Sequence, residues 1–296
     1  METDAGHVPV LLEETLELLA VRPGGLWVDG TLGLGGHAEA VLRRAAPDGR
    51  LLGLDRDEEA LERARARLAP FAARVRLEHA DYREIPARLG DEPASGILLD
   101  LGVSSLQLDD AERGFSFQRE GPLDMRMDRS EHGSASELVN RMRESDLADL
   151  IHEFGEEPYS RRIARAIARA REKAPIATTT ELAEIVRRAA PKSRRPGFHP
   201  ATRTFQALRI RTNRELDGLE PALERAALCL RSAGCMAVIA FHSLEDRAAK
   251  QAFRSLEARG FRVLTKKPLR PGEQETRDNP RARSARLRAI VREEAA

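Results

Sequence analysis

The 296-residue chain has little that could form covalent or metal cross-links. Its only two cysteines, Cys229 and Cys235, lack the C-x-x-C spacing of zinc and redox sites and are typical of reduced core residues. The seven histidines are scattered without the spacing of metal ligands. We therefore expect neither a disulfide nor a metal site.

Long apolar runs are also missing. No segment approaches the roughly 18 apolar residues that a membrane-spanning helix needs, and the N-terminus does not resemble a secretory signal. These absences predict a cytoplasmic globular protein without a membrane partner. The length suits one large domain or two moderate ones.

Three apolar segments in the first hundred residues each end in a carboxylate, namely Asp29, Asp55 and Asp100. In an open parallel sheet, ligands bind beyond the carboxyl ends of the strands. A glycine-rich turn, Gly30–Gly36, follows the first segment and lets a ligand approach the backbone closely. This pattern predicts a nucleoside pocket in which Asp55 accepts hydrogen bonds from the ribose hydroxyls.

The spacing within the glycine turn separates two classes of nucleoside cofactor. Dinucleotide sites read G-x-G-x-x-G, whereas Gly30 to Gly36 reads G-x-x-G-x-G-G. Asp29 stands directly before the turn, where its carboxylate would repel a pyrophosphate and attract a sulfonium or ammonium group. The turn therefore favours S-adenosyl-L-methionine over NAD. An NAD-dependent oxidoreductase is the second hypothesis, although no Lys, Tyr or His pair suited to hydride transfer is evident.

Strand and helix patterns alternate over the first hundred residues, with helices expected at 37–45 and 57–69. From about residue 108 the patterns indicate only helices and turns, including a helix that Thr178 and Glu181 would cap and that would end near Pro191. We predict an α/β fold, a doubly wound, mostly parallel sheet, with an inserted all-helical domain. The expected strands lie at 26–29, 51–55, 75–79, 97–100, 236–241, 261–264 and 285–291.

The net charge of +1 conceals a strong segregation of charge along the chain. Residues 159–214 hold fifteen Lys or Arg and three Glu, residues 109–157 hold six Arg and fourteen acidic residues, and residues 266–292 hold nine basic and three acidic residues. Basic segments of this size bind anionic polymers by releasing counterions. A solvated face of an Arg-rich helix explains any single basic run equally well, but two basic blocks on a nucleoside-binding fold favour RNA. The arginines expected near phosphates are Arg194, Arg195, Arg203, Arg209 and Arg211.

Several long strings of residues in this chain follow one another in the order in which they occur in one protein family, and no other family is expected to combine them. The chain thereby resembles, over essentially its whole length, the MraW-type family of bacterial methyltransferases that modify the exocyclic N4 of a decoding-region cytosine in 16S ribosomal RNA. The strings are Asp29–His37, Leu99–Ser105, Gln107–Asp109, Arg113–Phe117, Gly121–Met127, His199–Gln206 and Phe241–Arg247.

The resemblance implies a class I methyltransferase fold with a seven-stranded, Rossmann-like sheet. It also implies S-adenosyl-L-methionine as the cofactor and 16S rRNA, or the small ribosomal subunit, as the partner. The expected divisions are 1–107 and 206–296 for the methyltransferase domain and 108–205 for a helical, substrate-recognising insert. The cofactor-binding residues that the resemblance implies are Gly35, Gly36, His37, Asp55, Tyr82, Asp100 and Gln107.

The exocyclic amine of cytosine is a poor nucleophile, because its lone pair is delocalised into the ring. An acceptor for its N–H protons would localise that pair while the amine is held in line with the methyl group. Amino-methyltransferases usually place such an acceptor at the position of Asp100, where this chain lacks the usual Pro-Pro-aromatic continuation. Asp100 is therefore expected to contact the cofactor, the amine, or both, and a helix-capping role is the alternative. Ser104 and His242 are further expected catalytic residues, although a helix cap behind His242 would also explain that segment.

Other side chains are candidates for contacts with the substrate base. Ser105 lies beside Ser104, while Phe115, Phe117 and Phe205 could stack on a splayed base. Phenylalanines at such spacing more often belong to a core. A non-catalytic RNA-binding assembly factor that retains the fold is a third hypothesis, and the intact glycine turn and carboxylates favour an enzyme over it. The oligomeric state stays open.

Overall fold

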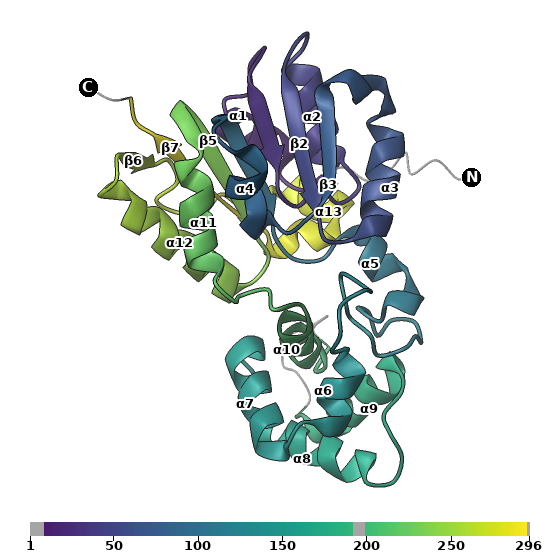
Figure 1. The fold of residues 1–296 in the computed structure, drawn as a ribbon. Helices are drawn as coiled ribbons and strands as arrows, with labels where there is room; N and C mark the ends of the chain where they lie inside the picture. Colours follow the sequence, from purple (N-terminus) through teal and green to yellow (C-terminus); the bar gives the residue numbers. More distant parts are fainter. Residues whose placement is uncertain (1–8, 192–198, 295–296) are drawn as a thin grey trace. The chain divides into compact units, whose positions relative to one another are not determined.

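The structure is a computed structural model that describes residues 9–191 and 199–294. The chain divides into two compact units (Figure 1): unit 1 comprises residues 1–102 and 218–296, and unit 2 comprises residues 103–217. The expected insert, 108–205, differs from unit 2 at both ends. Its expected C-terminal boundary falls inside helix α10 (Thr202–Asn213), which is one continuous helix. Arg194 and Arg195 lie outside the described residues.

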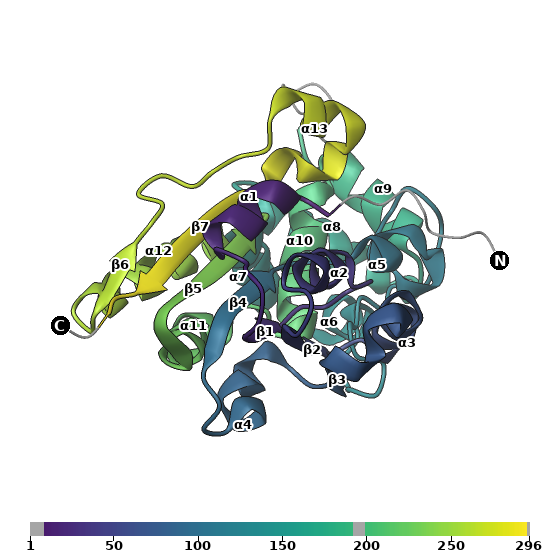
Figure 2. The same cartoon turned by 90° about the horizontal axis from the view of Figure 1, so that it is seen from above.

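Unit 1 contains a seven-stranded sheet in the order β3-β2-β1-β4-β5-β7-β6, which can be followed from edge to edge in Figure 2. Strands β1 to β5 pair in parallel, and β7 runs antiparallel to both β5 and β6. The predicted doubly wound, mostly parallel sheet is therefore confirmed. The strands are β1 (Leu26–Asp29), β2 (Arg50–Asp55), β3 (Val75–His79), β4 (Ala94–Asp100), β5 (Leu230–Ala240), β6 (Phe261–Val263) and β7 (Arg286–Arg292).

Strand β5 begins at Leu230, six residues before the expected start. The polar and small residues from Arg231 to Gly234 have the composition of a turn. The strand continues through them because Ala94 pairs with Leu230 while Gly96 pairs with Cys235, so that the extra residues are absorbed as an irregularity in the ladder.

Helices cover both faces of the sheet. Buried residues of α1, α2 and α3 pack with Trp27, Leu51 and Leu98 in one hydrophobic cluster, and Figure 2 shows α4 and α11 on the side of the sheet opposite α1 and α2. Strand β4 is buried along almost its whole length, as expected of a central parallel strand covered on both faces. The helices of unit 1 are α1 (Leu12–Leu18), α2 (Gly36–Arg44), α3 (Glu58–Arg67), α4 (Ile85–Leu89), α11 (Leu219–Leu228), α12 (Ser243–Glu257) and α13 (Glu273–Asp278).

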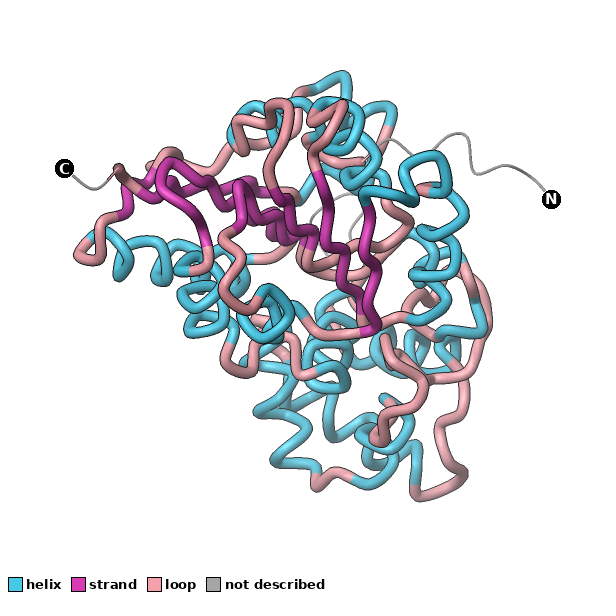
Figure 3. Tube along the Cα trace, turned by 45° about the horizontal axis from the view of Figure 1, so that its top comes forward, coloured by secondary structure: helices cyan, strands magenta, loops and turns pink. Residues whose placement is uncertain are grey.

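The described elements of unit 2 are helical, as the cyan segments of Figure 3 show. Phe115 and Phe205 are buried in its core, and the ring of Phe117 packs edge-on against that of Phe205 at 4.8 Å. These phenylalanines therefore serve the core. The helices of unit 2 are α5 (Ser105–Asp109), α6 (Ala135–Arg141), α7 (Glu144–Gly155), α8 (Ser160–Arg171), α9 (Thr179–Ala189) and α10.

The start of α9 is close to the expected one. The Thr178 side chain accepts a hydrogen bond from the Glu181 backbone N–H at 3.3 Å, whereas the Glu181 carboxylate accepts from Ala177 rather than from Thr178. Within residues 9–191 and 199–294, no helix is long and apolar enough to cross a bilayer.

Candidate active site

Three carboxylates stand at one edge of the sheet in unit 1. Asp29, Asp55 and Asp100 are the last residues of β1, β2 and β4, and β1 lies between the other two strands. Because these strands are parallel, their carboxyl ends meet at the same edge, which is where ligands bind in folds of this kind. The side chain of Thr31, in the glycine turn, accepts a hydrogen bond from the Asp100 backbone N–H at 2.6 Å and ties β4 to the turn.

Burial makes two of these carboxyl groups difficult to ionise. Desolvation raises the pKa of Asp29 to about 7, against the hydrogen bond that its carboxylate accepts from the Thr31 backbone. Desolvation also raises the pKa of Asp55 to about 6, although its two oxygens accept from the backbone N–H groups of Gly33, at 2.7 Å, and Asp57, at 2.9 Å. A cation bound here would stabilise both charged forms.

Asp100 faces the interior more than the solvent. Desolvation, followed by the charges of Asp29 and Glu245, raises the pKa of its carboxyl well above the usual range. Its Oδ1 atom is buried and has no hydrogen-bond partner among the described residues, although the side chain as a whole is 26% exposed. A buried acceptor without a partner is costly unless a ligand supplies a donor.

The imidazole of His37 lies next to Asp100. Its Nε2 is 3.0 Å from the Val10 carbonyl oxygen, and because a carbonyl only accepts, Nε2 carries a proton. The Nδ1 atom then faces Asp100 Oδ2 at 3.7 Å. This separation is longer than a hydrogen bond, so the two side chains are close neighbours at the edge of the sheet.

The glycine turn leads closely into α2. Gly35 caps that helix with φ +76°, a conformation that favours glycine, and a Cβ on Gly36 would lie 2.6 Å from Pro9 Cγ. Tyr82 follows β3 and is 8% exposed, with the Arg83 guanidinium 4.7 Å from the centre of its ring. The turn, the partnerless Asp100 oxygen and the three carboxylates fit a nucleoside that carries positive charge, as S-adenosyl-L-methionine does. They do not fit a pyrophosphate.

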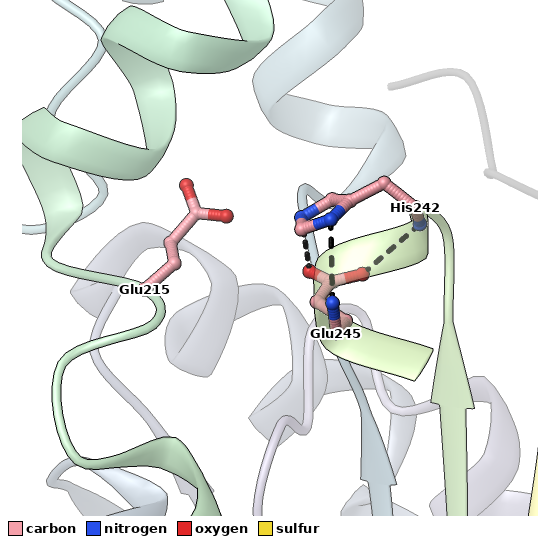
Figure 4. Close-up of side chains that lie close together, drawn as sticks. All are labelled: Glu215, His242 and Glu245. Atoms are coloured by element: carbon pink, nitrogen blue, oxygen red, sulfur yellow. Dashed lines mark hydrogen bonds and ion pairs between the residues drawn. The ribbon is translucent and has the colours of Figure 1, made fainter. Parts of the chain in front are cut away.

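His242 begins helix α12 as its N-cap (Figure 4). Its Nδ1 accepts from the Glu245 backbone N–H at 3.4 Å, while its Nε2 lies 3.1 Å from Glu245 Oε1. The Glu245 carboxylate in turn accepts from the backbone N–H groups of His242 and Phe241. The sequence placed the cap on the residues after His242. The structure corrects this, because the histidine itself is the cap.

Ser104 and Gln107 form the corresponding arrangement at the start of α5 in unit 2. The Ser104 hydroxyl accepts from the Gln107 backbone N–H at 3.2 Å, and Gln107 Oε1 accepts from the Ser104 backbone N–H at 3.1 Å. This reciprocal cap gives both side chains a local structural role. Their expected contacts with cofactor and substrate stay predictions.

Comparison with known proteins decides the family. The family model described as the MraW methylase family matches residues 4–293. The chain belongs to the MraW methylase family. It is 50% identical to the ribosomal RNA small subunit methyltransferase H of Symbiobacterium thermophilum, over 97% of this chain and 96% of that protein. It is 51% identical to the proteins of the same name from Syntrophotalea carbinolica, over 97% and 98%, and Acidobacterium capsulatum, over 96% and 97%.

Membership of the MraW family confirms the resemblance drawn from the sequence and rules out the hypothesis of an NAD-dependent oxidoreductase. In unit 1, the structure brings together Gly35, Gly36, His37, Asp55 and Asp100 around the carboxyl ends of β1, β2 and β4. The sequence did not single out Glu245, which is 2% exposed and raises the pKa of Asp100. Its place three residues after His242 was the available signal, because a Glu at this spacing forms a capping box.

Two of the three described arginines of this MraW chain that were expected to contact phosphates are engaged in contacts within the protein. The Arg209 guanidinium forms two hydrogen bonds with Glu215, at 2.9 and 2.7 Å, and its side chain is 15% exposed. Arg203 donates to the Glu156 carbonyl and lies 3.8 Å from Glu157. Arg211 is exposed. Structural contacts therefore compete with the expected phosphate contacts of Arg203 and Arg209.

Proposed function

We propose that this protein transfers a methyl group from S-adenosyl-L-methionine to the exocyclic N4 of a decoding-region cytosine in the 16S rRNA of the small ribosomal subunit. The observation that carries the proposal is full-length membership of the MraW family, with relatives near 50% identity that are named small-subunit rRNA methyltransferases. The carboxylates at the ends of β1, β2 and β4 support it, because they suit a nucleoside cofactor that carries a positive charge.

S-adenosyl-L-methionine would supply the electrophilic methyl group, and the residues of the chain would bind and orient the reactants. Asp55 is proposed to accept from the ribose hydroxyls, and Asp29 to attract the positive charge of the cofactor. Gly35, Gly36, His37, Tyr82 and Gln107 complete the proposed cofactor set.

Asp100 is the proposed acceptor for the cytosine amine. Its partnerless Oδ1 is suited to an N–H donor, and accepting that hydrogen bond localises the nitrogen lone pair as the nitrogen becomes tetrahedral. His37, whose Nδ1 lies 3.7 Å from Asp100 Oδ2, is placed to share the proton that Asp100 takes up. Ser104 and His242 remain proposed contacts with the substrate.

The proposal is tested by incubating the protein with tritiated S-adenosyl-L-methionine and small ribosomal subunits that lack the modification. The RNA is then digested to nucleosides and analysed by mass spectrometry. We expect label in N4-methylcytidine. Label in another nucleoside would overturn the assigned atom, and cofactor binding without any transfer to subunits or free 16S rRNA would favour the non-catalytic assembly factor.

A further inference from the structure

Helix α8 of unit 2 presents one apolar and one strongly basic face. Ile163, Ala164 and Ile167 are completely buried in the core of the unit. On a helix of 3.6 residues per turn, the exposed arginines fall within about 100° of arc on the opposite side and extend over about 12 Å. We call this the α8 arginine face; its members are Arg161, Arg162, Arg165 and Arg169.

These arginines have fewer partners than several other arginines of the basic segment 159–214. Arg187 and Arg188 both bind Glu184, at 2.6 Å, and Arg214 binds Asp217 at 3.0 Å. On the α8 arginine face, Arg165 lies 3.6 Å from Glu144. Among the described residues, Arg161, Arg162 and Arg169 have no ion pair or side-chain hydrogen bond. Their charges are thus available to an external anion.

The position of these charges is unfavourable for the helix itself. The first turn of α8 contains no acidic residue and includes Arg161 and Arg162, although the positive end of a helix dipole disfavours cations by about 0.3–1 kcal/mol each. By contrast, α7 and α9 have acids in their first turns, whereas α10 has none and includes Arg203, which is held by Glu156 and Glu157. Arg161 and Arg162 have no such partner among the described residues, so an external anion would stabilise this end of the helix.

An exposed aromatic side chain stands at the same end of the helix. Tyr159, the residue before α8 begins, is 47% exposed, and Leu269 is the other large apolar side chain exposed among the described residues. Exposed aromatic rings beside guanidinium groups are the combination with which proteins bind single-stranded nucleic acid. The ring stacks on a base while the cations hold the phosphates.

We propose that the α8 arginine face and Tyr159 form a binding surface for single-stranded RNA, in which Arg161, Arg162 and Arg169 contact phosphates and Tyr159 stacks on a base. The inference rests on the proposed function, because an rRNA substrate must present an unpaired cytosine. It goes further by naming the surface of unit 2 that holds the neighbouring nucleotides. The sequence indicates the basic segment as a whole, whereas the exposure of Tyr159 is visible only in the structure.

The test measures binding of a fluorescein-labelled, unstructured RNA oligonucleotide to the full chain at several salt concentrations. The variant R161Q/R162Q/R169Q removes three unpaired charges. The control R143Q/R187Q/R188Q removes three charges from the same unit, all of which are engaged with Asp146 or Glu184. Each phosphate contact contributes about 0.7 to the slope of log affinity against log salt for single strands. We expect the α8 variant to lose about 2 from that slope, and the control to lose little.

Tyr159 is tested separately, because stacking carries no salt dependence. We expect Tyr159→Ala to weaken RNA binding about tenfold at an unchanged salt slope, and Tyr159→Phe to bind like the wild type. Cofactor affinity should stay at the wild-type value in every variant, and the unfolding temperature of the α8 variant and of the Tyr159 variants should not fall, which excludes misfolding as the cause. Removing Arg161 and Arg162 removes an unfavourable interaction with the helix dipole. If these arginines had only a structural role, RNA binding would not weaken.

The outcomes separate this inference from the proposed function. If the wild type binds RNA and methylates small subunits while the α8 and control variants lose equal slope, or Tyr159→Ala binds normally, the proposed surface is wrong and the function stands. If the wild type methylates no RNA at all, the proposed function fails instead. A stronger loss with a duplex RNA than with the single strand would also overturn the assignment to unpaired nucleotides.

Discussion

At the scale of single residues, burial raises the pKa values of two carboxyl groups at the sheet edge into the physiological range. Asp29, with a pKa raised to about 7, and Asp55, with a pKa raised to about 6, ionise near neutral pH because burial removes water from them. A raised pKa means that the folded protein binds more protons than the unfolded chain. The corresponding stabilisation is present in acid and is lost as the pH rises through the folded pKa.

The variant Asp29→Asn isolates this effect on stability. Asparagine keeps an oxygen that accepts from Thr31 and cannot ionise. Relative to the wild type, we expect the variant to gain stability between pH 5 and pH 8, by an amount on the order of 2–4 kcal/mol. Urea unfolding at both pH values measures it, with the exposed Asp48→Asn as the control. A stability difference that does not change with pH would contradict the raised pKa.

The same carboxyl groups predict how cofactor binding depends on pH. A protonated carboxyl attracts no cation, so the affinity for S-adenosyl-L-methionine should increase about tenfold as the pH rises from 5.5 to 8, through the pKa values of Asp55 and Asp29. S-adenosylhomocysteine, which lacks the sulfonium charge, should respond less. Isothermal titration calorimetry with both ligands checks this. An identical pH dependence for the two would mean that the carboxylates do not sense the sulfonium.

At the scale of elements, two residues that the sequence predicts to be catalytic are N-caps of helices in the structure. His242 and Ser104 begin α12 and α5, each with a residue three positions on that completes a capping box. The sequence predicts a cap directly after His242, one residue later than the structure has it, and histidine is not among the preferred N-cap residues. The pattern Ser104-x-x-Gln107 is itself a capping signal, so the sequence contains the evidence for this local role as well as for the ligand contact that the family resemblance implies.

His242 allows the structural role to be separated from the catalytic one. Asparagine is among the best N-cap residues, whereas alanine cannot accept the Glu245 backbone hydrogen bond. We therefore expect His242→Asn to be more stable than His242→Ala by about 1 kcal/mol. Equal stability of the two variants would rule out the cap. If the ring also contacts the substrate, His242→Asn lowers kcat/KM at least tenfold while keeping the stability of the fold.

At the scale of the whole molecule, the sequence was sufficient for the architecture and less so for its boundaries. Apolar runs that end in Asp29, Asp55 and Asp100 predicted three parallel strands correctly, because central strands are nearly continuous apolar segments. The end of the helical insert was expected at 205, inside α10, because nothing in the pattern of a continuous helix marks where a domain ends. The raised pKa of Asp100 depends on burial and on the charge of Glu245, which is distant in the sequence, so no local pattern indicates it.

The central claim is that Asp100, at the end of β4, accepts the proton of the cytosine amine. It is tested most directly by the single-turnover rate of methyl transfer to unmodified small subunits, at saturating S-adenosyl-L-methionine, for the wild type and Asp100→Asn. Saturation removes the contribution of Asp100 to cofactor affinity, which calorimetry measures separately. We predict a rate lower by at least a hundredfold, in the range typical of a lost general base. A variant that transfers at the wild-type rate once saturated would contradict the account and leave Asp100 with cofactor binding alone.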